Sequence, residues 1–411
     1  MVHSLMGLTT LLAAAWLLSE NRRFIPWRTV AAGLIMQAAI AVLMLKAPLF
    51  REIFFGLNTI VMTFQEATQA GTSFVFGYLG GGPLPFAETK PGGSFSLAFQ
   101  ALPLVLVIGA LTALFYYWRI LPKVVRGFSW VLRKSMGIGG ALGVVSSGCI
   151  FLGMIESPLL IRPYLSKLTR SELFAMMAVG LSCIAGTMLV LYGTVLKGVI
   201  PDAFGHILTA SIIHAPAALV LASVMVPETE NQTLGGEISS YEATSAMDAL
   251  AKGTWDGLHL LFNIVAILIV FVALVKLVNI GLGQFADVYG APLTLERILG
   301  TLMAPVVWLI GVPWEEARTA GALMGTKVVL NEFLAYIELS KLPPGALGDK
   351  SRMIMTYAMC SFANLGSLGI LIGGLGSLCP ERRDEITAMG VKALIAGILA
   401  SLMTGAIVGM L

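Results

Sequence analysis

Charged side chains are scarce in this sequence. Only 26 of the 411 residues are Lys or Arg and 23 are Asp or Glu, so charged residues make up 12% of the chain, against about 25% in an average soluble domain. Hydrophobic residues make up 57%, and the mean hydropathy is +0.87. A soluble protein cannot hide so much apolar side chain, because its surface still needs polar cover. The composition excludes a soluble enzyme, a nucleic-acid-binding protein and a disordered chain, and it indicates an integral membrane protein.

Motifs of cofactor chemistry are lacking as well. The four cysteines and four histidines are scattered, without a spacing that holds a metal ion. No phosphate-binding loop of the form G-x-x-x-x-G-K-[ST] occurs, which argues against an ATP-driven mechanism. The apolar stretches are continuous, whereas the strands of a membrane β-barrel alternate. The sequence therefore predicts an all-α polytopic membrane protein that needs no cofactor.

Long apolar runs dominate what is present. A helix needs about 20 mostly apolar residues to cross a bilayer. Eight segments are expected to do so: 4–20, 29–46, 99–118, 172–196, 203–225, 257–281, 353–376 and 386–410. The first has no Lys or Arg ahead of it, so it is expected to be a retained helix and not a secretory signal. Three other apolar stretches, 52–95, 137–165 and 296–340, are interrupted by Gly, Pro or carboxylates.

Basic residues set the expected orientation, because Lys and Arg collect on the cytoplasmic side of the bacterial inner membrane. They cluster at residues 22–28, 119–134, 162–170 and 382–383. All four clusters share one side only if 137–165 enters and leaves by the cytoplasmic face and 296–340 returns to the outer face. We therefore expect two re-entrant hairpins of opposite orientation, with both termini outside.

Intramembrane carboxylates mark both of these segments. A carboxylate at bilayer depth costs about 2.5–3.5 kcal/mol, so it needs a partner or a role. In the first segment Glu156 precedes Pro158, which interrupts a regular helix. In the second, the Gly and Pro of residues 311–313 interrupt the chain, and Glu332 follows Asn331.

A third polar interruption lies within the expected span 353–376. Asn364 and Ser367 are three residues apart, so on a continuous helix both would face one side. A lone Asn or Ser in a membrane helix is more often a packing hydrogen bond than a site. Two broken segments of opposite orientation, one in each half, are however typical of inverted-repeat transporters. The residues by themselves favour a secondary transporter of a small polar solute.

The same residues carry a family resemblance. Gly153-Met154-Ile155-Glu156-Ser157-Pro158-Leu159 resembles the first hairpin of the concentrative nucleoside transporters, and the runs 311–317, 331–333 and 361–364 are similar to the second hairpin and the helix after it. The resemblance implies eight transmembrane helices, two re-entrant hairpins, an interfacial helix within 52–70 and a homotrimer in the lipid bilayer. It also implies cation-coupled nucleoside import by an elevator-like movement.

The chain is expected to divide into five parts, of which the linker is recognised by its acidic, Ser-, Thr- and Gly-rich composition. These are N-terminal scaffold and trimerisation helices, the first hairpin with its following helices, a cytoplasmic linker, a scaffold helix, and the second hairpin with the C-terminal helices: 1–135, 136–226, 227–256, 257–295 and 296–411. The resemblance assigns the ribose hydroxyls to Glu332, Asn364 and Ser367, where charge-assisted hydrogen bonds would form. Phe362 would pack against the ligand, and Glu156 would face the base.

The sequence departs from the family pattern at the base. Members commonly carry Gln followed by Thr or Ser before the first-hairpin Glu, and those side chains hydrogen-bond the nucleobase. This chain has Met154 and Ile155, which cannot. We expect weaker or altered base discrimination.

A second departure concerns the coupling ion. The positions that hold Na⁺ in relatives correspond to Cys149, Leu152, Cys183 and Ile184. Na⁺ prefers oxygen ligands, and two thiols supply none. The backbone carbonyls of Leu152 and Ile184 remain, so a Na⁺ site would lack two ligands. Proton coupling is favoured over Na⁺, with Glu156 or Glu332 as candidate carriers.

Other functions stay open at this point. An intramembrane enzyme could use Glu156, Glu315, Glu316 and Glu332 as acid and base groups on a lipid-linked substrate. A channel is a further alternative, although two occluding hairpins suit alternating access better than an open pore. The solute could also be nucleoside-like but different from the common nucleosides.

Overall fold

The computed structural model describes residues 2–88, 93–234, 238, 243–285, 290 and 292–411, and every regular element in them is helical. The α-helices are α1 (Val2–Leu17), α2 (Trp27–Lys46), α3 (Pro48–Phe76), α4 (Leu104–Tyr117), α5 (Ile120–Met136), α6 (Gly140–Gly148), α7 (Glu156–Leu159), α8 (Arg170–Ser182), α9 (Gly186–Leu196), α10 (Ala203–Met225), α11 (Ala246–Leu282), α12 (Leu295–Leu309), α13 (Trp314–Val329), α14 (Glu332–Lys341), α15 (Asp349–Met359), α16 (Leu365–Leu378) and α17 (Arg383–Met410). Short 3-10 or π turns occupy 77–80, 97–101, 162–167 and 380–382.

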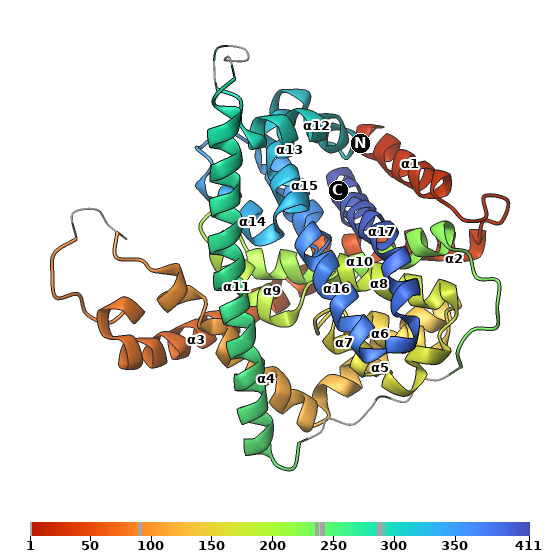
Figure 1. Ribbon diagram of the computed structural model, residues 1–411, viewed down its shortest axis with the longest axis horizontal. Coiled ribbons are helices and arrows are strands. Elements are labelled where there is room, and N and C mark those ends of the chain that lie inside the picture. Colours follow the sequence, from red (N-terminus) through yellow and green to blue (C-terminus); the bar gives the residue numbers. More distant parts are fainter. Residues whose placement is uncertain (1, 89–92, 235–237, 239–242, 286–289, 291) are drawn as a thin grey trace.

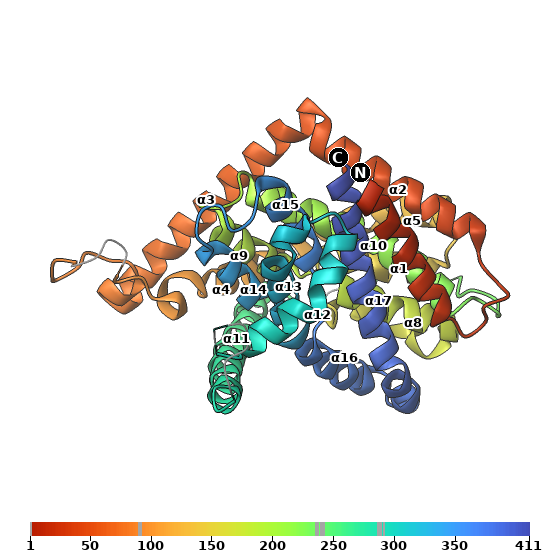
Figure 2. The same cartoon turned by 90° about the horizontal axis from the view of Figure 1, so that it is seen from above.

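The helices are arranged around α10 and α17, which lie in the middle of the protein (Figure 1). In each long helix we compare the 18-residue stretch that best fits a membrane span. In α10, 89% of that stretch is buried inside the protein, and in α11 none of it is. The long helix α11 packs along α4 at one side, and α3 projects away from the other helices in both views (Figures 1 and 2). The expected interfacial helix 52–70 lies within α3.

Six helices in the described part of the chain are long and apolar enough to cross a membrane. They correspond to the expected spans that begin at 29, 99, 172, 203, 257 and 386. The first expected span is shorter than predicted, since its apolar helix covers only His3–Leu17. The span expected over 353–376 is not continuous: α15 ends at Met359 and α16 begins at Leu365.

The two halves of the chain repeat one order of elements. Two helices, α4 and α5, are followed by the pair α6 and α7, the pair α8 and α9, and then α10. The same order runs from α11 and α12 through α13 and α14, then α15 and α16, to α17. The expected span 172–196 is broken between Ser182 and Gly186. In the repeated order of elements, this break between α8 and α9 corresponds to the break between α15 and α16 in the second half.

The segment 296–340 holds three helices instead of one hairpin. A bend of 117° separates α12 from α13 at the predicted Gly and Pro interruption. A second interruption follows at Leu330, whose backbone leaves the helical region, and α14 begins at Glu332. The interruption that carries Glu332 is therefore this second one. It corresponds to the turn of residues 149–155 between α6 and α7.

The linker after α10 is shorter than the sequence predicts, and hydrogen bonds attach it to the helices. Residues 246–256 belong to α11, which begins at Ala246. Nearer α10, Thr233 donates from its backbone N and from Oγ1 to the buried Glu172 carboxylate, at 3.0 and 2.7 Å. Gly140 N donates to the Thr233 carbonyl at 3.0 Å. These bonds tie the linker to the first residues of both α6 and α8.

Charged residues from the loop after α1, from α8 and from α17 pair at one end of the protein. Arg170 pairs with Glu20 at 3.0 Å and Glu385 at 3.5 Å, and Lys392 pairs with Glu20 at 3.2 Å. The Arg170 guanidinium, hydrogen-bonded to Glu20, and the Lys392 ammonium hold the pKa of this carboxyl below its usual value. The loop after α1 and the starts of α8 and α17 therefore share one end.

Candidate functional site

Two asparagines cap the helices on which the candidate site is built. Asn331 accepts a hydrogen bond from Leu334 N at 2.8 Å and so begins α14, and Asn364 accepts one from Ser367 N at 2.8 Å and begins α16. Asparagine is among the best residues for this position, because its oxygen satisfies a free N–H at the helix start. The predicted pairing of Asn364 and Ser367 on one helix face is thus wrong. Asn364 precedes the helix, and the two residues are joined by the cap.

The Glu332 carboxylate is the centre of the site. It is the first residue of α14 and only 4% exposed. Tyr192 Oη donates to its Oε1 at 2.5 Å, and Asn364 Nδ2 donates to its Oε2 at 2.9 Å. A carboxylate can accept about four hydrogen bonds, so each oxygen keeps room for one more donor. The arrangement suits a ligand that offers two neighbouring hydroxyl groups.

A buried lysine holds the break between α15 and α16 beside this carboxylate. Lys327 is completely buried, and its Nζ donates to the Ala363 carbonyl at 2.9 Å. Ala363 lies next to Asn364, so α13 supports the residue that binds Glu332. Phe362 is half-buried in the same break, and Ser367 is 8% exposed in the first turn of α16. The structure therefore brings all four residues predicted around the ribose into one region.

Aromatic side chains fix Tyr192 in place. Its ring is stacked on that of Phe333, with centroids 6.0 Å apart, and lies 5.1 Å from that of Tyr336. Tyr336 Oη donates to the Thr356 carbonyl at 2.7 Å. Tyr192 is itself completely buried in α9. The Glu332 carboxylate thus receives donors from the broken helices of both halves.

The turn between α6 and α7 packs against α8 and α16. Met154 is 8% exposed and lies against Gly180 of α8. A Cβ atom added at Gly180 would be 3.2 Å from the Cβ atom of Met154. Ile155 lies against Gly374 of α16. Glu156 is exposed, its carboxylate folds back toward Gly153, and the hydrogen bonds found around Glu332 do not include it.

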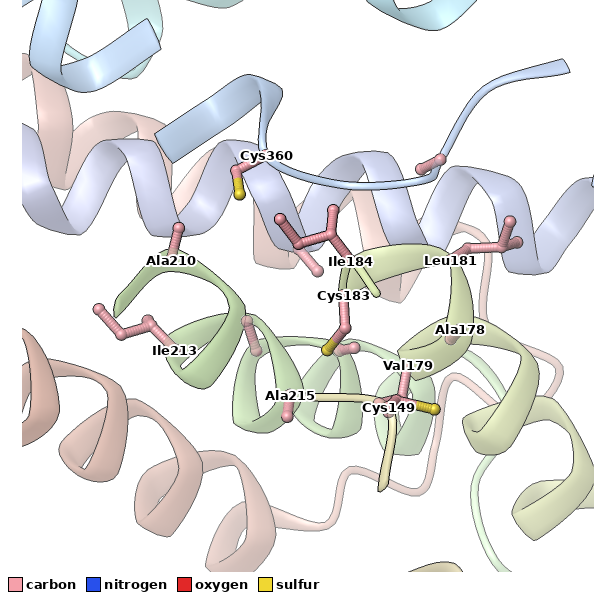
Figure 3. Close-up of a cluster of buried hydrophobic side chains, with 14 of the residues drawn as sticks. Cys149, Ala178, Val179, Leu181, Cys183, Ile184, Ala210, Ile213, Ala215 and Cys360 are labelled. Carbon is pink, nitrogen blue, oxygen red and sulfur yellow. The ribbon is translucent and has the colours of Figure 1, made fainter. Parts of the chain in front are cut away.

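The four residues predicted around the cation are all buried and lie in two adjoining breaks. Cys149 and Leu152 belong to the turn after α6, and Cys183 and Ile184 to the break between α8 and α9. Figure 3 shows Cys149, Cys183 and Ile184 in one cluster with Cys360. Gly186 N donates to the Phe151 carbonyl at 2.9 Å, which joins the turn to the break.

Helix α10 completes this second region through Ser211. Its Oγ donates to the Ile150 carbonyl at 3.3 Å, and its own carbonyl accepts a long contact of 3.6 Å from Cys183 Sγ. No group of three or more His, Cys, Asp or Glu side chains that could hold a metal ion occurs among the described residues. Backbone carbonyls and the Ser211 hydroxyl supply oxygen atoms in this region.

Tyr192 and Lys327 were not assigned a role from the sequence. Each is a polar residue in a segment that must cross or enter the membrane, and such residues carry a functional hypothesis by default. That signal was present in the sequence. Their connection to Glu332 and to the α15 break was not, because 140 residues separate Tyr192 from Glu332.

Three family models match the chain. They are described as Na⁺ dependent nucleoside transporter N-terminus (residues 6–79), nucleoside recognition (98–198) and Na⁺ dependent nucleoside transporter C-terminus (206–409). An uncharacterized transporter, YutK, of Bacillus subtilis is 39% identical over 99% of this chain and 98% of its own length. The nucleoside permease NupC of Helicobacter pylori is 35% identical over 100% and 97%.

Solved structures agree with these matches. CNTnw in an inward-facing substrate-bound state matches with a TM-score of 0.90 and 36% identity, over 100% of this chain and 97% of its own. A variant of CNTnw in an outward-facing state matches with the same score. The match identifies a multi-pass membrane transporter of nucleosides and excludes the intramembrane enzyme. The chain belongs to the concentrative nucleoside transporter family.

Proposed function

We propose that the protein imports nucleosides by proton symport, with the ribose bound at Glu332. The observation that carries this proposal is the buried carboxylate, which two donors orient and which keeps one free acceptor site on each oxygen. Two vicinal hydroxyls of a ribose can fill both. Ser367 and Asn364 supply further polar groups beside it, and Phe362 supplies an apolar wall in the same break.

The coupling ion is a proton in this proposal, although the descriptions of two family models name Na⁺. The two positions that would add side-chain ligands are Cys149 and Cys183, and the Cys183 thiol is turned to the Ser211 carbonyl. A thiol is a poor ligand for a hard cation. Substrate binding between broken helices supports an elevator-type alternating access. The structures of CNTnw and of its variant, solved in inward-facing and outward-facing states, support it as well.

The proposed topology puts both termini on the outer side of a bacterial inner membrane. The ends of α1 and α17 lie side by side in both views, and an added Cβ at Gly409 would be 3.0 Å from Ser4 Oγ (Figures 1 and 2). The basic clusters at the opposite ends of these helices, joined through Glu20, would face the cytoplasm. A homotrimer is proposed on the family resemblance.

Uptake of uridine and adenosine into proteoliposomes, with Na⁺ and pH gradients imposed separately, tests this function. Accumulation driven by the pH gradient alone is the expected result. Accumulation that requires Na⁺ at constant pH would contradict proton coupling. Absence of accumulation of either nucleoside would contradict the assignment of nucleosides as substrates. A channel would equilibrate the nucleosides without accumulating them.

Base discrimination is expected to be weak. Met154 and Ile155 offer no hydrogen bond and pack against glycines of α8 and α16, so a base meets an apolar surface. Excess unlabelled uridine and adenosine should inhibit labelled uridine uptake with potencies within about ten-fold of each other, the effect of roughly one missing hydrogen bond. Strict uridine preference in this competition assay would contradict the expectation. Replacing both residues, Met154→Gln with Ile155→Thr, should widen the difference.

Tyr192→Phe tests the orientation of Glu332. The change removes the hydroxyl that donates at 2.5 Å and keeps the ring contacts with Phe333 and Tyr336. A hydrogen bond to a charged group is worth about 1.5–3 kcal/mol, so the affinity for uridine should fall about ten-fold or more. Tyr164→Phe is the matched control, because Tyr164 lies in the turn after α7. Unchanged uridine binding in Tyr192→Phe would contradict the role.

A further inference from the structure

Helix α5 divides its side chains among three faces. One face is buried against the protein, and its residues recur every three or four positions: Pro122, Val125, Ser129, Leu132 and Met136. A second face is apolar and exposed, and it carries Ile120, Val124 and Val131. The third face is exposed and basic. This pattern is typical of a helix that lies in a membrane interface, with apolar side chains toward the acyl chains and basic side chains toward the headgroups.

The basic face gathers the cations of α5 around one tryptophan. At about 3.6 residues per turn, the side chains of this face fall within about 100° of the helix circumference. They are Lys123, Arg126, Trp130, Arg133 and Lys134, and all are exposed. No Asp or Glu occurs between residues 120 and 136. Among the described residues these cations form no ion pair, whereas Arg170, Arg382 and Lys392 do. The described part of the chain therefore leaves the positive charge of this face without a partner of opposite charge.

Helix α5 lies at the end of the protein where α2 begins. The apolar stretch Leu97–Tyr117 before it is long enough to cross a membrane, and Arg119, with a φ of 60°, turns the chain into α5. At the other end of α5, Thr29 Oγ1 donates to the Met136 carbonyl at 3.3 Å, so α5 ends beside the first turn of α2. Both termini lie in the upper part of Figure 1, and α5 lies in the lower part. In the proposed topology, α5 is therefore at the cytoplasmic leaflet.

An open hollow of about 360 Å³ lies at the end of the basic face. It is lined by Trp130, Arg133, Lys134, Gly137 and Ile138. Gly137 ends α5 with a φ of 67°, a conformation that favours glycine, and a Cβ atom added there would meet nothing within 4 Å. The hollow is therefore open above the helix end, and two cations and an aromatic ring form its wall.

Packing positions both cations of this hollow. Lys134 Nζ lies 4.9 Å from the centroid of the Trp130 ring, which is itself 61% exposed. A Cβ atom added at Gly143 would be 2.7 Å from Arg133 Cγ and 2.9 Å from its Cδ, so the arginine stem lies on α6. The stem is held while the side chain as a whole remains exposed. A guanidinium and an ammonium are thus placed beside an exposed indole ring.

An anionic phospholipid matches this set of groups. Arginine binds phosphate oxygens with two parallel N–H donors, and lysine adds a point charge. Tryptophan is enriched at the level of the headgroups, and the negative surface of the cytoplasmic leaflet attracts basic segments next to a membrane helix. The exposed Ile120, Val124 and Val131 would then lie beside the acyl chains. A free phosphate ion would use the cations only and would leave the indole ring and the apolar face without a contact.

We propose that the end of α5 binds the headgroup of an anionic phospholipid of the cytoplasmic leaflet, with Arg133 and Lys134 on its phosphate and Trp130 beside its glycerol. The inference uses the proposed topology only to choose the leaflet, and it depends neither on the nucleoside nor on the coupling ion. Because the Arg133 stem lies on α6, the bound lipid attaches the start of the first hairpin to the membrane surface.

The test uses the purified full chain in a neutral detergent, with phosphatidylglycerol as the probe and phosphatidylethanolamine of the same acyl chains as the zwitterionic reference. Native mass spectrometry counts the lipid bound during a titration. The unchanged protein should bind phosphatidylglycerol at least about ten-fold more tightly than the reference lipid. Arg133→Gln with Lys134→Gln should weaken phosphatidylglycerol binding about ten-fold or more, because each Lys or Arg near the surface contributes to the attraction. The exchange Arg133→Lys with Lys134→Arg keeps both charges and should stay within about three-fold.

Arg162→Gln with Lys167→Gln is the matched control, because both side chains are exposed in the turn 162–167 and the variant loses the same two charges. It should bind phosphatidylglycerol within about two-fold of the unchanged protein. An equal loss in this control would overturn the inference, since net charge and not the end of α5 would then attract the lipid. Unchanged lipid binding in the α5 variant would overturn it as well.

Two further measurements complete the test. Glycerol phosphate, the soluble headgroup, should not displace bound phosphatidylglycerol at equal concentration, and displacement would contradict a lipid site in favour of a phosphate site. Uridine binding within about two-fold of the unchanged protein shows that a variant is folded. Should the double variant fail this check, the single change Lys134→Gln on an exposed side chain gives the same comparison, with an expected loss of about three-fold or more.

Discussion

Glu332→Gln is expected to abolish nucleoside accumulation and to weaken uridine binding by about 100-fold or more. Both neighbours of the carboxylate, Tyr192 Oη and Asn364 Nδ2, are donors. An amide in the same place turns its NH₂ toward one of them, so a donor meets a donor in a buried site. Two or more hydrogen bonds to a charged acceptor are lost or weakened, each worth about 1.5–3 kcal/mol. Isothermal titration of uridine and uptake into proteoliposomes measure the effect.

Glu315→Gln is the control for this change. Glu315 is exposed at the start of α13, the helix whose far end leads to Glu332. It carries the same chemical substitution in the helix before Glu332, and it should leave uridine binding within about two-fold, as exposed substitutions away from a site usually do. If Glu332→Gln bound uridine as tightly as the control, the ribose site would have to lie elsewhere.

Cys149→Asn combined with Cys183→Ser is expected to make uptake depend on Na⁺. The two changes place an amide oxygen and a hydroxyl in adjoining breaks, where carbonyls and Ser211 already supply oxygen. Na⁺ prefers such oxygen ligands, and each thiol that now occupies these positions is a poor one. Raising Na⁺ at constant pH should stimulate uridine uptake by about ten-fold, equivalent to a coupling free energy of about 1.4 kcal/mol.

Cys360→Ser serves as the matched control. Cys360 is buried in the same cluster as Cys183 (Figure 3), and its thiol lies on the Ile207 carbonyl at 3.7 Å. It is not among the predicted cation positions, so its replacement by serine should leave uptake indifferent to Na⁺. A double variant that stays folded, transports uridine and ignores Na⁺ would show that the cysteines are not what prevents Na⁺ coupling.

Much of the architecture could be predicted because hydropathy and charge are local properties. Six of the eight expected spans coincide with apolar helical stretches long enough to cross a membrane, although 172–196 is broken between α8 and α9. The order of interrupted segments repeats in both halves. The break before Gly186 could not be predicted, because Cys183, Ile184 and Ala185 are all compatible with a helix. In the fold, the turn after α6 packs against this break: Gly186 N donates to the Phe151 carbonyl, and Ser211 Oγ donates to the Ile150 carbonyl.

The residues of the candidate site could be predicted from the sequence, but the hydrogen bonds between them could not. Glu332 and Asn364 stand out in the sequence, since each is polar within an apolar stretch. Their hydrogen bond, and the cap that Asn364 forms, depend on the break between α15 and α16. The high hydropathy of 353–376 predicts one continuous helix there. Glu156 lies at the start of α7, outside the hydrogen bonds around Glu332.

The sequence by itself determined the membrane environment, the two interrupted halves and the family, because these follow from how much apolar side chain the chain carries and from short runs of neighbouring residues. Only the tertiary structure decided that Tyr192 and Asn364 meet at Glu332, and that Lys327 reaches the Ala363 carbonyl in the break between α15 and α16. The reason is physical. In a membrane interior, where water cannot satisfy a polar group, each such side chain must find a protein partner, and that partner comes from whichever helix the fold brings close.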